Sequence, residues 1–248
     1  MTKDLHNYII QLGDNSLILG HRISEWCGHG PVLEQDIALT NIALDHVGQA
    51  RMYYQLAATM EPGKTEDDYA YLRTVTEYKN LLLLEQENKD FGYTIARSFY
   101  YDQFHLLLLR ALKSCGNKDL SEIAAQAYKE VSYHCRFSSD WVKRLGDGTE
   151  ESHRRIQRAL DDFFPYTAEF FTPSEADNYV SGKYGVDLSK LSSQWSVIVE
   201  NIVREATLTM PTTPYPQLGG KQGHHSEKLG FILTELQYMQ RTYPNSTW

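Results

Sequence analysis

The chain has 248 residues, 42% hydrophobic and 23% charged, which is enough apolar material for one large or two small globular domains. Its net charge of −8 and the absence of a Lys/Arg-rich cluster argue against a nucleic-acid partner. No apolar run approaches the ~18 residues of a membrane span, and the opening MTKDLHNYII lacks the apolar core of a signal peptide.

The three cysteines, Cys27, Cys115 and Cys135, are odd in number and show no CxxC spacing. This pattern favours reduced thiols over a disulfide framework or a zinc site. Cys135 is interpreted as a small core residue and not as a nucleophile. We therefore expect a cytoplasmic protein that does not contact a membrane.

The first part of the chain predicts two long helices, because apolar residues recur at alternating steps of three and four. The first is expected at about residues 4–26 and ends at the run CGHGP, since glycine caps a helix and proline cannot continue one. The second is expected at about 32–60, with Asp45 and Gln49 on its apolar seam. Residues 66–77 predict a shorter helix or helical turn.

The rest of the chain also reads as helical. Residues 80–87 form an apolar run too short to assign, and long helices are expected at 88–111 and 124–145. Further helices are expected at about 151–163, 174–181, 188–209 and 226–241. The sequence thus predicts an all-α fold in a single domain, 1–248, with a four-helix core at about 4–145 and a C-terminal helical extension at about 150–248.

About midway along each long helix, polar residues fall on the apolar seam. They are Ser16, Asp45 with Gln49, Asp102 with His105, and Glu130 with His134. A carboxylate or imidazole directed into a bundle core is costly unless it bonds to another group, to water or to a metal. The core of the chain is therefore expected to be organised around this polar layer.

A ferritin-like carboxylate bundle holds two irons in such a layer, with a Glu from each of two helices and a Glu-x-x-His pair from each of the other two. Here Ser16 stands where the first helix would offer a carboxylate. On the second helix His46 and Gln49 replace the Glu-x-x-His pair. The first half of the iron site is therefore essentially absent.

The second half of the site keeps more polar residues. Val131 lies three residues before His134, and Glu130 is one residue off the required spacing, rotated by about 100° around the helix. Asp102, His105, Glu130 and His134 could in principle hold one ion. A hydrogen-bonded structural cluster is the favoured interpretation, with a bound metal as the alternative.

Several longer motifs follow one family. They are LGDN at 12–15, EWCGHGP at 25–31, LD-x-x-GQAR at 44–51, TIAR at 94–97, YHCRFS at 133–138, RLG-x-GT at 144–149, GGKQG-x-H at 219–225 and LQYMQR at 236–241. Over essentially its full length the chain resembles the PaaC subunits of bacterial phenylacetyl-CoA epoxidases.

The resemblance implies a ferritin-like fold and a pairing with the homologous PaaA subunit, which carries the di-iron centre. That complex uses oxygen, with electrons passed from NADPH by a reductase subunit, to epoxidise the ring of phenylacetyl-CoA. It further implies a structural subunit, not catalytic by itself and without a cofactor of its own. Of the ligands in the catalytic sibling, His134 matches outright and Asp102 loosely, whereas Ser16, His46, Gln49 and Val131 depart from them.

Two other functions remain open from the residues alone. One is an active di-iron oxygenase or oxidase, and the other is a ferritin-like metal-binding or storage protein. The missing carboxylates weigh against both, because too few anions remain to neutralise two iron ions.

A partner surface is expected on two of the long helices, where aromatic residues exceed what a solvated face needs. The residues are Met52, Tyr53, Tyr54, Phe99, Tyr100 and Tyr101. They predict an interface with PaaA or, in its absence, with a second copy of this chain. The loop at 219–223 lacks the spacing of a phosphate-binding loop and is interpreted as flexible or partner-contacting.

Overall fold

The computed structural model describes residues 2–213, 215–244 and 246, and every regular element among them is a helix. The chain forms two compact units, Met1–Gln86 with Gly219–Trp248 (unit 1) and Glu87–Leu218 (unit 2). The all-α prediction is confirmed, whereas the single-domain organisation stays a prediction. In the part of the chain that the structure describes, no helix is both long and apolar enough to cross a membrane.

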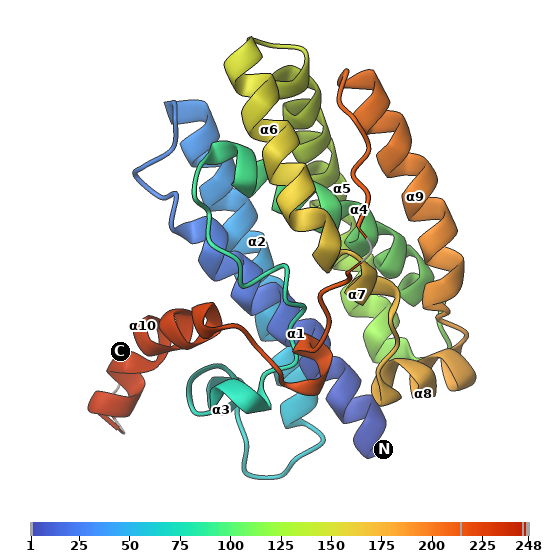
Figure 1. Cartoon of the computed structure of the whole chain (residues 1–248). Helices are drawn as coiled ribbons and strands as arrows, with labels where there is room; N and C mark the ends of the chain where they lie inside the picture. Colours follow the sequence, from blue (N-terminus) through green and yellow to red (C-terminus); the bar gives the residue numbers. More distant parts are fainter. Residues whose placement is uncertain (1, 214, 245, 247–248) are drawn as a thin grey trace. The chain divides into compact units, whose positions relative to one another are not determined.

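Each unit is built on a hairpin of two long helices (Figure 1). Unit 1 contains α1 (Lys3–Ser24), α2 (Leu33–Ala58), α3 (Glu66–Tyr71), η1 (Val75–Glu77), η3 (Gly220–Gln222) and α10 (Glu227–Thr242). Unit 2 contains α4 (Phe91–Lys113), α5 (Lys118–Gly146), α6 (Glu150–Phe163), η2 (Phe164–Tyr166), α7 (Ala168–Phe171), α8 (Glu175–Tyr184) and α9 (Leu188–Glu205). The hairpins α1–α2 and α4–α5 supply the long helices of a ferritin-like fold.

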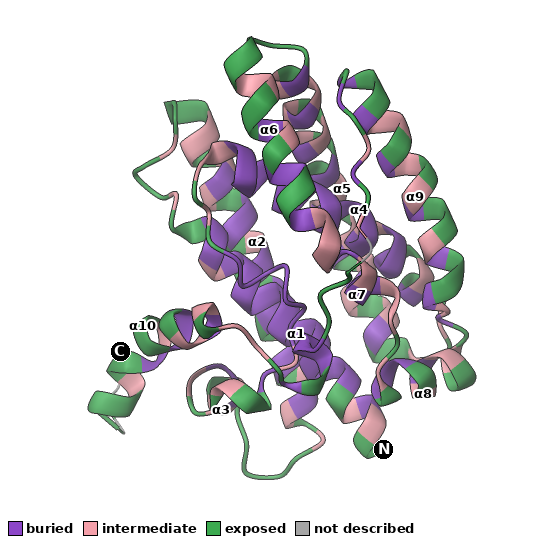
Figure 2. Ribbon diagram, in the orientation of Figure 1, coloured by how far each residue is buried: buried purple, intermediate pink, exposed green. Residues whose placement is uncertain are grey.

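The α1 helix is buried on nearly every side (Figure 2), although its sequence suggests a single apolar seam. It begins at the N-cap Thr2, whose hydroxyl accepts a hydrogen bond from the backbone N–H of Leu5. The run of residues 81–84, which has no regular helix, is also buried. The Leu81 N–H in this run donates to Asn15 Oδ1 of α1 at 2.8 Å.

The seam of α2 differs from the prediction by one residue. His46, not Asp45, is the buried residue beside Gln49, and Asp45 is half-buried. Two glycines of α1, one heptad apart, explain the difference. An added Cβ would lie 2.5 Å from the Tyr54 ring at Gly13 and 3.3 Å from His46 Cβ at Gly20. These close approaches fix which face of α2 packs on α1.

The aromatic clusters expected at an interface lie in the core instead. Among them Tyr53, Tyr54, Phe99, Tyr100 and Tyr101 are all buried, so the prediction that these side chains form an exposed interface is wrong. The reason is that these helices bury more than one face.

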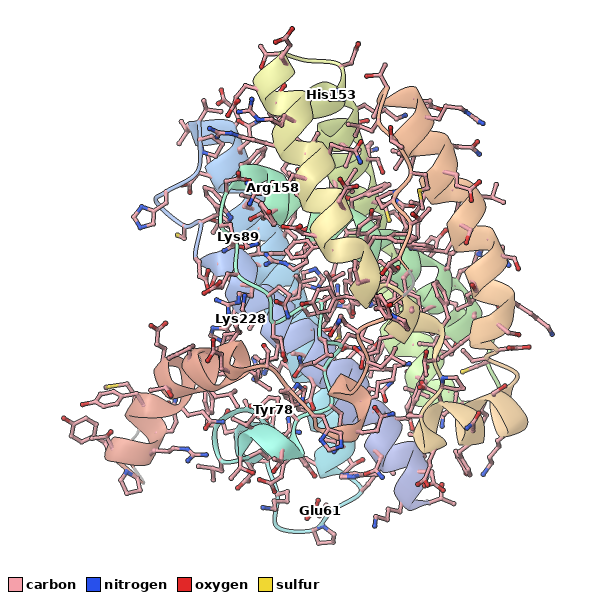
Figure 3. The ribbon with its side chains drawn as sticks, viewed as in Figure 1. Glu61, Tyr78, Lys89, His153, Arg158 and Lys228 are labelled. Atoms are coloured by element: carbon pink, nitrogen blue, oxygen red, sulfur yellow. The ribbon has the colours of Figure 1, made fainter. Side chains whose placement is uncertain are left out.

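Unit 2 places α6 and α9 against its hairpin, and small residues permit the close approach. At the end of α5, a Cβ on Gly146 would lie 2.2 Å from the Ala206 carbonyl oxygen, so no side chain fits there. The same glycine carbonyl lies 2.7 Å from Nδ1 of His153, which is labelled in Figure 3 on α6. Residues 150–218 of the expected extension therefore belong to unit 2.

Residues 219–248 return to unit 1, where the loop at 219–223 is tightly packed. A Cβ on Gly220 would lie 2.1 Å from the Asn80 carbonyl oxygen, and Lys221 is buried. The glycines of this loop thus serve close packing against residues 76–82, which speaks against a flexible loop. Its contact with a partner stays a prediction, since Gln222 is exposed.

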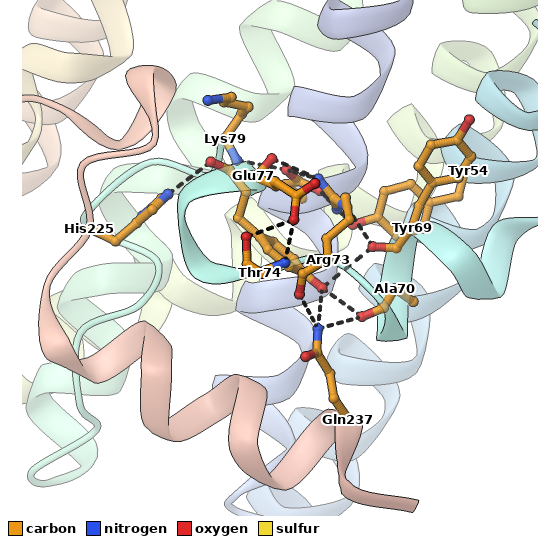
Figure 4. A network of polar contacts seen from close by, with 11 residues as sticks. Tyr54, Tyr69, Ala70, Arg73, Thr74, Glu77, Lys79, His225 and Gln237 are labelled. Atoms are coloured by element: carbon orange, nitrogen blue, oxygen red, sulfur yellow. Dashed lines mark hydrogen bonds and ion pairs between the residues drawn. The ribbon is translucent and has the colours of Figure 1, made fainter. Parts of the chain in front are cut away.

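A buried polar network stabilises unit 1 (Figure 4). Asp14 of α1 accepts hydrogen bonds from Tyr54 Oη at 2.6 Å and from the Lys79 N–H at 2.7 Å, and it pairs with the Arg73 guanidinium. Gln237 of α10 donates through Nε2 to the Arg73 carbonyl at 3.0 Å. The network thus joins α1, α2, the segment after α3 and α10.

His225 ties the C-terminal segment to the same unit. Its Nδ1 lies 2.8 Å from Glu85 Oε2 and its Nε2 lies 2.9 Å from the Tyr78 carbonyl oxygen. Because both neighbours are acceptors, the geometry calls for a proton on each ring nitrogen, the imidazolium form. Burial lowers the pKa of His225, but the hydrogen bonds to Glu85 and Tyr78 outweigh it, and the pKa is raised.

This contact predicts that alkaline conditions loosen the C-terminal segment. A raised folded-state pKa stabilises the protein fully below the unfolded pKa of about 6.5, and this contribution is lost as the pH rises through the folded-state value. We expect hydrogen-exchange protection of α10 to fall as the pH rises above about 6.5 and through the raised folded-state pKa of His225. The variant His225→Gln should show lower protection with a smaller pH dependence, and equal pH dependence in the two proteins would contradict the assignment.

Candidate functional site: a buried polar cluster on α4 and α5

The polar residues expected on the third and fourth long helices lie in the interior. Asp102 and His105 of α4 and His134 of α5 are all buried. The helices begin at defined caps: the Asp90 carboxylate accepts from the Tyr93 N–H and the Asn117 side chain from the Leu120 N–H. The helical period then carries the polar residues onto the inward faces, as the sequence predicts.

Asp102 is the centre of the cluster. Ser138 Oγ donates to Asp102 Oδ2 at 2.8 Å, and Cys135 Sγ donates to the Asp102 carbonyl oxygen at 3.0 Å. A carboxylate oxygen of Asp102 also lies within 4.8 Å of a ring nitrogen of His134. Sequence reasoning did not assign Ser138 or Cys135 to this cluster, although both lie within four residues of His134 on the same helix.

Burial is the largest cause of the pKa shifts of Asp102 and His105. It raises the pKa of Asp102 to about 6, although His134 and the Ser138 hydrogen bond act in the opposite direction. Burial, together with the electrostatic interaction with the neighbouring His134 side chain, lowers the pKa of His105 to about 3. His105 is therefore neutral at pH 7. Because Asp102 is a better base in the folded chain than in the unfolded chain, its contribution to stability decreases as the pH rises from about 4 to 6.

The thiol of Cys135 is poorly suited to act as a nucleophile or a metal ligand. Burial, reinforced by the charge of Asp102, raises its pKa well above the ordinary value. The thiolate that would act as a nucleophile or a metal ligand is therefore disfavoured at neutral pH. The interpretation of Cys135 as a buried core residue is confirmed.

The other predicted positions of unit 2 lie on the same two helices. Val131 is fully buried, and Glu130 beside it is half-buried. The ring of His105 packs on that of Tyr101 with centroids 5.0 Å apart. The direct Glu130–His134 pair stays a prediction.

In unit 1 the predicted positions offer few metal ligands. Ser16, His46 and Gln49 are buried, and Asp45 is half-buried. The fully buried carboxylate of α1 is Asp14, which the Arg73 pair and the Tyr54 hydroxyl already engage. Sequence reasoning missed this role, although Asp14 belongs to the motif LGDN.

A di-iron centre of the ferritin-like type needs four carboxylates and two histidines. Along the middle of the four long helices, the buried or half-buried carboxylates among the described residues are Asp14, Asp45, Asp102 and Glu130. Asp14 is already paired with Arg73 within unit 1. The side chains of Ser16, Gln49 and Val131 carry no carboxylate.

An all-helical chain built on two long hairpins with a polar layer defines a protein of the ferritin-like class. The family model described as phenylacetic acid catabolic protein matches residues 1–248, and the chain belongs to this family. A relative from Escherichia coli (strain K12), the C subunit of 1,2-phenylacetyl-CoA epoxidase, is 42% identical over 247 residues. The match covers 99% of this chain and 100% of the relative.

Proposed function

We propose that this chain is the non-catalytic structural subunit of a multicomponent phenylacetyl-CoA epoxidase. The full-length match to a protein named as one subunit of such an enzyme supports membership of the same kind of complex. Its partners would then be the other epoxidase subunits, above all a PaaA subunit that holds the di-iron centre. In the absence of PaaA, a second copy of this chain is the alternative partner.

The side chains at the expected iron-ligand positions are the main support for a non-catalytic role. Ser16, Gln49 and Val131 occupy positions at which a ferritin-like di-iron site needs carboxylate or histidine ligands. The raised pKa of Asp102 and its bond to Ser138 suit a buried hydrogen-bonded cluster that fixes α4 against α5. The role we assign to the chain is to hold and stabilise its catalytic partner.

The variant His134→Ala tests this role. His134 is fully buried beside Asp102, so its removal should cost on the order of 1–3 kcal/mol of stability and leave turnover of the assembled epoxidase largely intact. Thermal melting of the chain and epoxidation by the reconstituted complex would be measured together. His29→Ala, at an exposed position, is the matched control.

An unchanged melting midpoint combined with lost turnover would contradict the structural role. That outcome would favour a catalytic His134 and an active oxygenase. A lowered midpoint with retained turnover is the result that the proposal requires.

A further inference from the structure

We propose that the outward face of α2 binds an apolar helix of the catalytic partner subunit, one whose flanks carry Lys or Arg. The inference rests on the proposed function for the identity of the partner. It replaces the surface expected from the buried tyrosines with one that the structure exposes. We call this face the α2 outer stripe, and it consists of Leu33, Ile37, Leu44, Val47 and Gly48.

The α2 outer stripe is apolar and open to solvent. Leu33 is 72% exposed, Ile37 52%, Leu44 63% and Val47 40%. Their spacing of four, seven and three residues keeps them on one side of the helix over roughly 21 Å of its length. Four exposed large apolar side chains on one side of a helix, interrupted by Thr40 and Asn41, are more than a solvated helix face needs and are typical of an interface.

Gly48 supports a closely packed helix as the occupant. Gly48 lies in the middle of α2 on its solvent-exposed side, and a Cβ added to it would meet no atom within 4 Å. A glycine in a helix interior costs about 0.5–1 kcal/mol relative to alanine. Packing within the chain gives no reason for this cost, whereas a second helix crossing close to the backbone at Gly48 would.

A cavity of about 260 Å³ adjoins the stripe within unit 1. It shares Val47 with the stripe and continues between α2 and α3. Its walls are the apolar and aromatic side chains of Leu17, Val47, Ala50, Tyr54, Ala70 and Tyr71, with Arg51, Glu66 and Asp67 as charged lining residues. A hollow of this size beside an exposed helix face can receive one large apolar side chain from the occupant, the arrangement typical of an interface anchor.

The acidic residues that flank the α2 outer stripe favour binding of a different chain over binding of a second copy of this one. Residues 33–50 of α2 contain Glu34, Asp36 and Asp45 and no Lys or Arg. The first cation along the helix, Arg51, lies 3.5 Å from Glu66 of the same unit. A second copy docked through this stripe would bring acidic flanks together. A helix with basic flanks would neutralise them, which gives specificity as well as affinity.

The test uses the full chain co-expressed with the PaaA subunit of the same epoxidase. Leu44→Glu places a charge at the centre of the stripe, and Gly48→Leu blocks close approach while improving helix propensity. Each should weaken the complex by about tenfold or more in Kd. Val197→Glu, at a 59% exposed apolar position on α9, is the control and should bind as the unchanged chain does. Far-ultraviolet circular dichroism confirms that each variant is folded.

Binding at unchanged affinity by both stripe variants would overturn the surface and leave the proposed function standing. Failure of the unchanged chain to bind PaaA would contradict the proposed function itself and remove the partner. A photo-reactive residue at position 44 supplies a second measurement. Cross-linking to a PaaA helix flanked by Lys or Arg supports the proposal, whereas cross-linking to a second copy of this chain overturns it.

Discussion

Replacing Asp14 by alanine is expected to lower the free energy of unfolding by about 3–5 kcal/mol. Asp14 is fully buried, and its carboxylate accepts from Tyr54 Oη and the Lys79 N–H while it pairs with Arg73. Without the carboxylate, the Arg73 guanidinium loses its buried counter-charge. A buried pair broken from one side costs far more than the pair contributes, because the remaining charge stays desolvated.

Urea denaturation of the two proteins measures this loss. The control is Lys118→Ala, which removes an exposed contact to Glu122 of 3.7 Å and should leave the transition midpoint unchanged. A loss below about 1 kcal/mol for Asp14→Ala would show that the network does not stabilise unit 1.

Substitution of Tyr100 by glutamate is expected to prevent unit 2 from folding. Tyr100 is fully buried on α4, its hydroxyl donates to the Leu160 carbonyl at 3.3 Å, and its ring lies 5.8 Å from that of Trp195. A carboxylate at this position would have neither water nor a counter-charge, a cost of several kcal/mol. If the side chain were part of a partner surface, the same change would only abolish docking.

Soluble yield and the far-ultraviolet helical signal distinguish these possibilities. We expect both to fall sharply for Tyr100→Glu and to stay normal for Tyr133→Glu, which alters an aromatic residue 40% exposed on α5. A native signal with a normal melting midpoint for Tyr100→Glu would mean that this face of α4 is not a packed core.

The helices could be predicted because their boundaries depend on local chemistry. The first helix ends at Ser24, two residues before the predicted end and just ahead of the run CGHGP. The helix α5 begins at Lys118, six residues before the predicted start, because Asn117 caps it. The buried face of α2 could not be predicted, because it depends on Gly13 and Gly20 of another helix. Hydrophobic spacing alone allowed either Asp45 or His46 on the seam.

The candidate site shows the same division. The helical period places Asp102, His105 and His134 at buried positions, as predicted. The sequence also shows that Val131 stands three residues before His134, where the Glu-x-x-His motif has its glutamate. The Asp14–Arg73 pair joins residues 59 positions apart, and no local pattern marks such a contact. The sequence could indicate that iron ligands are missing, but not which of the remaining carboxylates another side chain had already engaged.

The iron content of the chain purified alone from iron-supplemented cells tests the non-catalytic assignment most directly. The donor set, with Ser16, Gln49 and Val131 at ligand positions and Asp14 committed to Arg73, predicts fewer than one iron per chain by elemental analysis. It also predicts no oxygen-dependent absorption in the visible region. Two tightly bound irons per chain would contradict the account and identify the chain as an active di-iron protein.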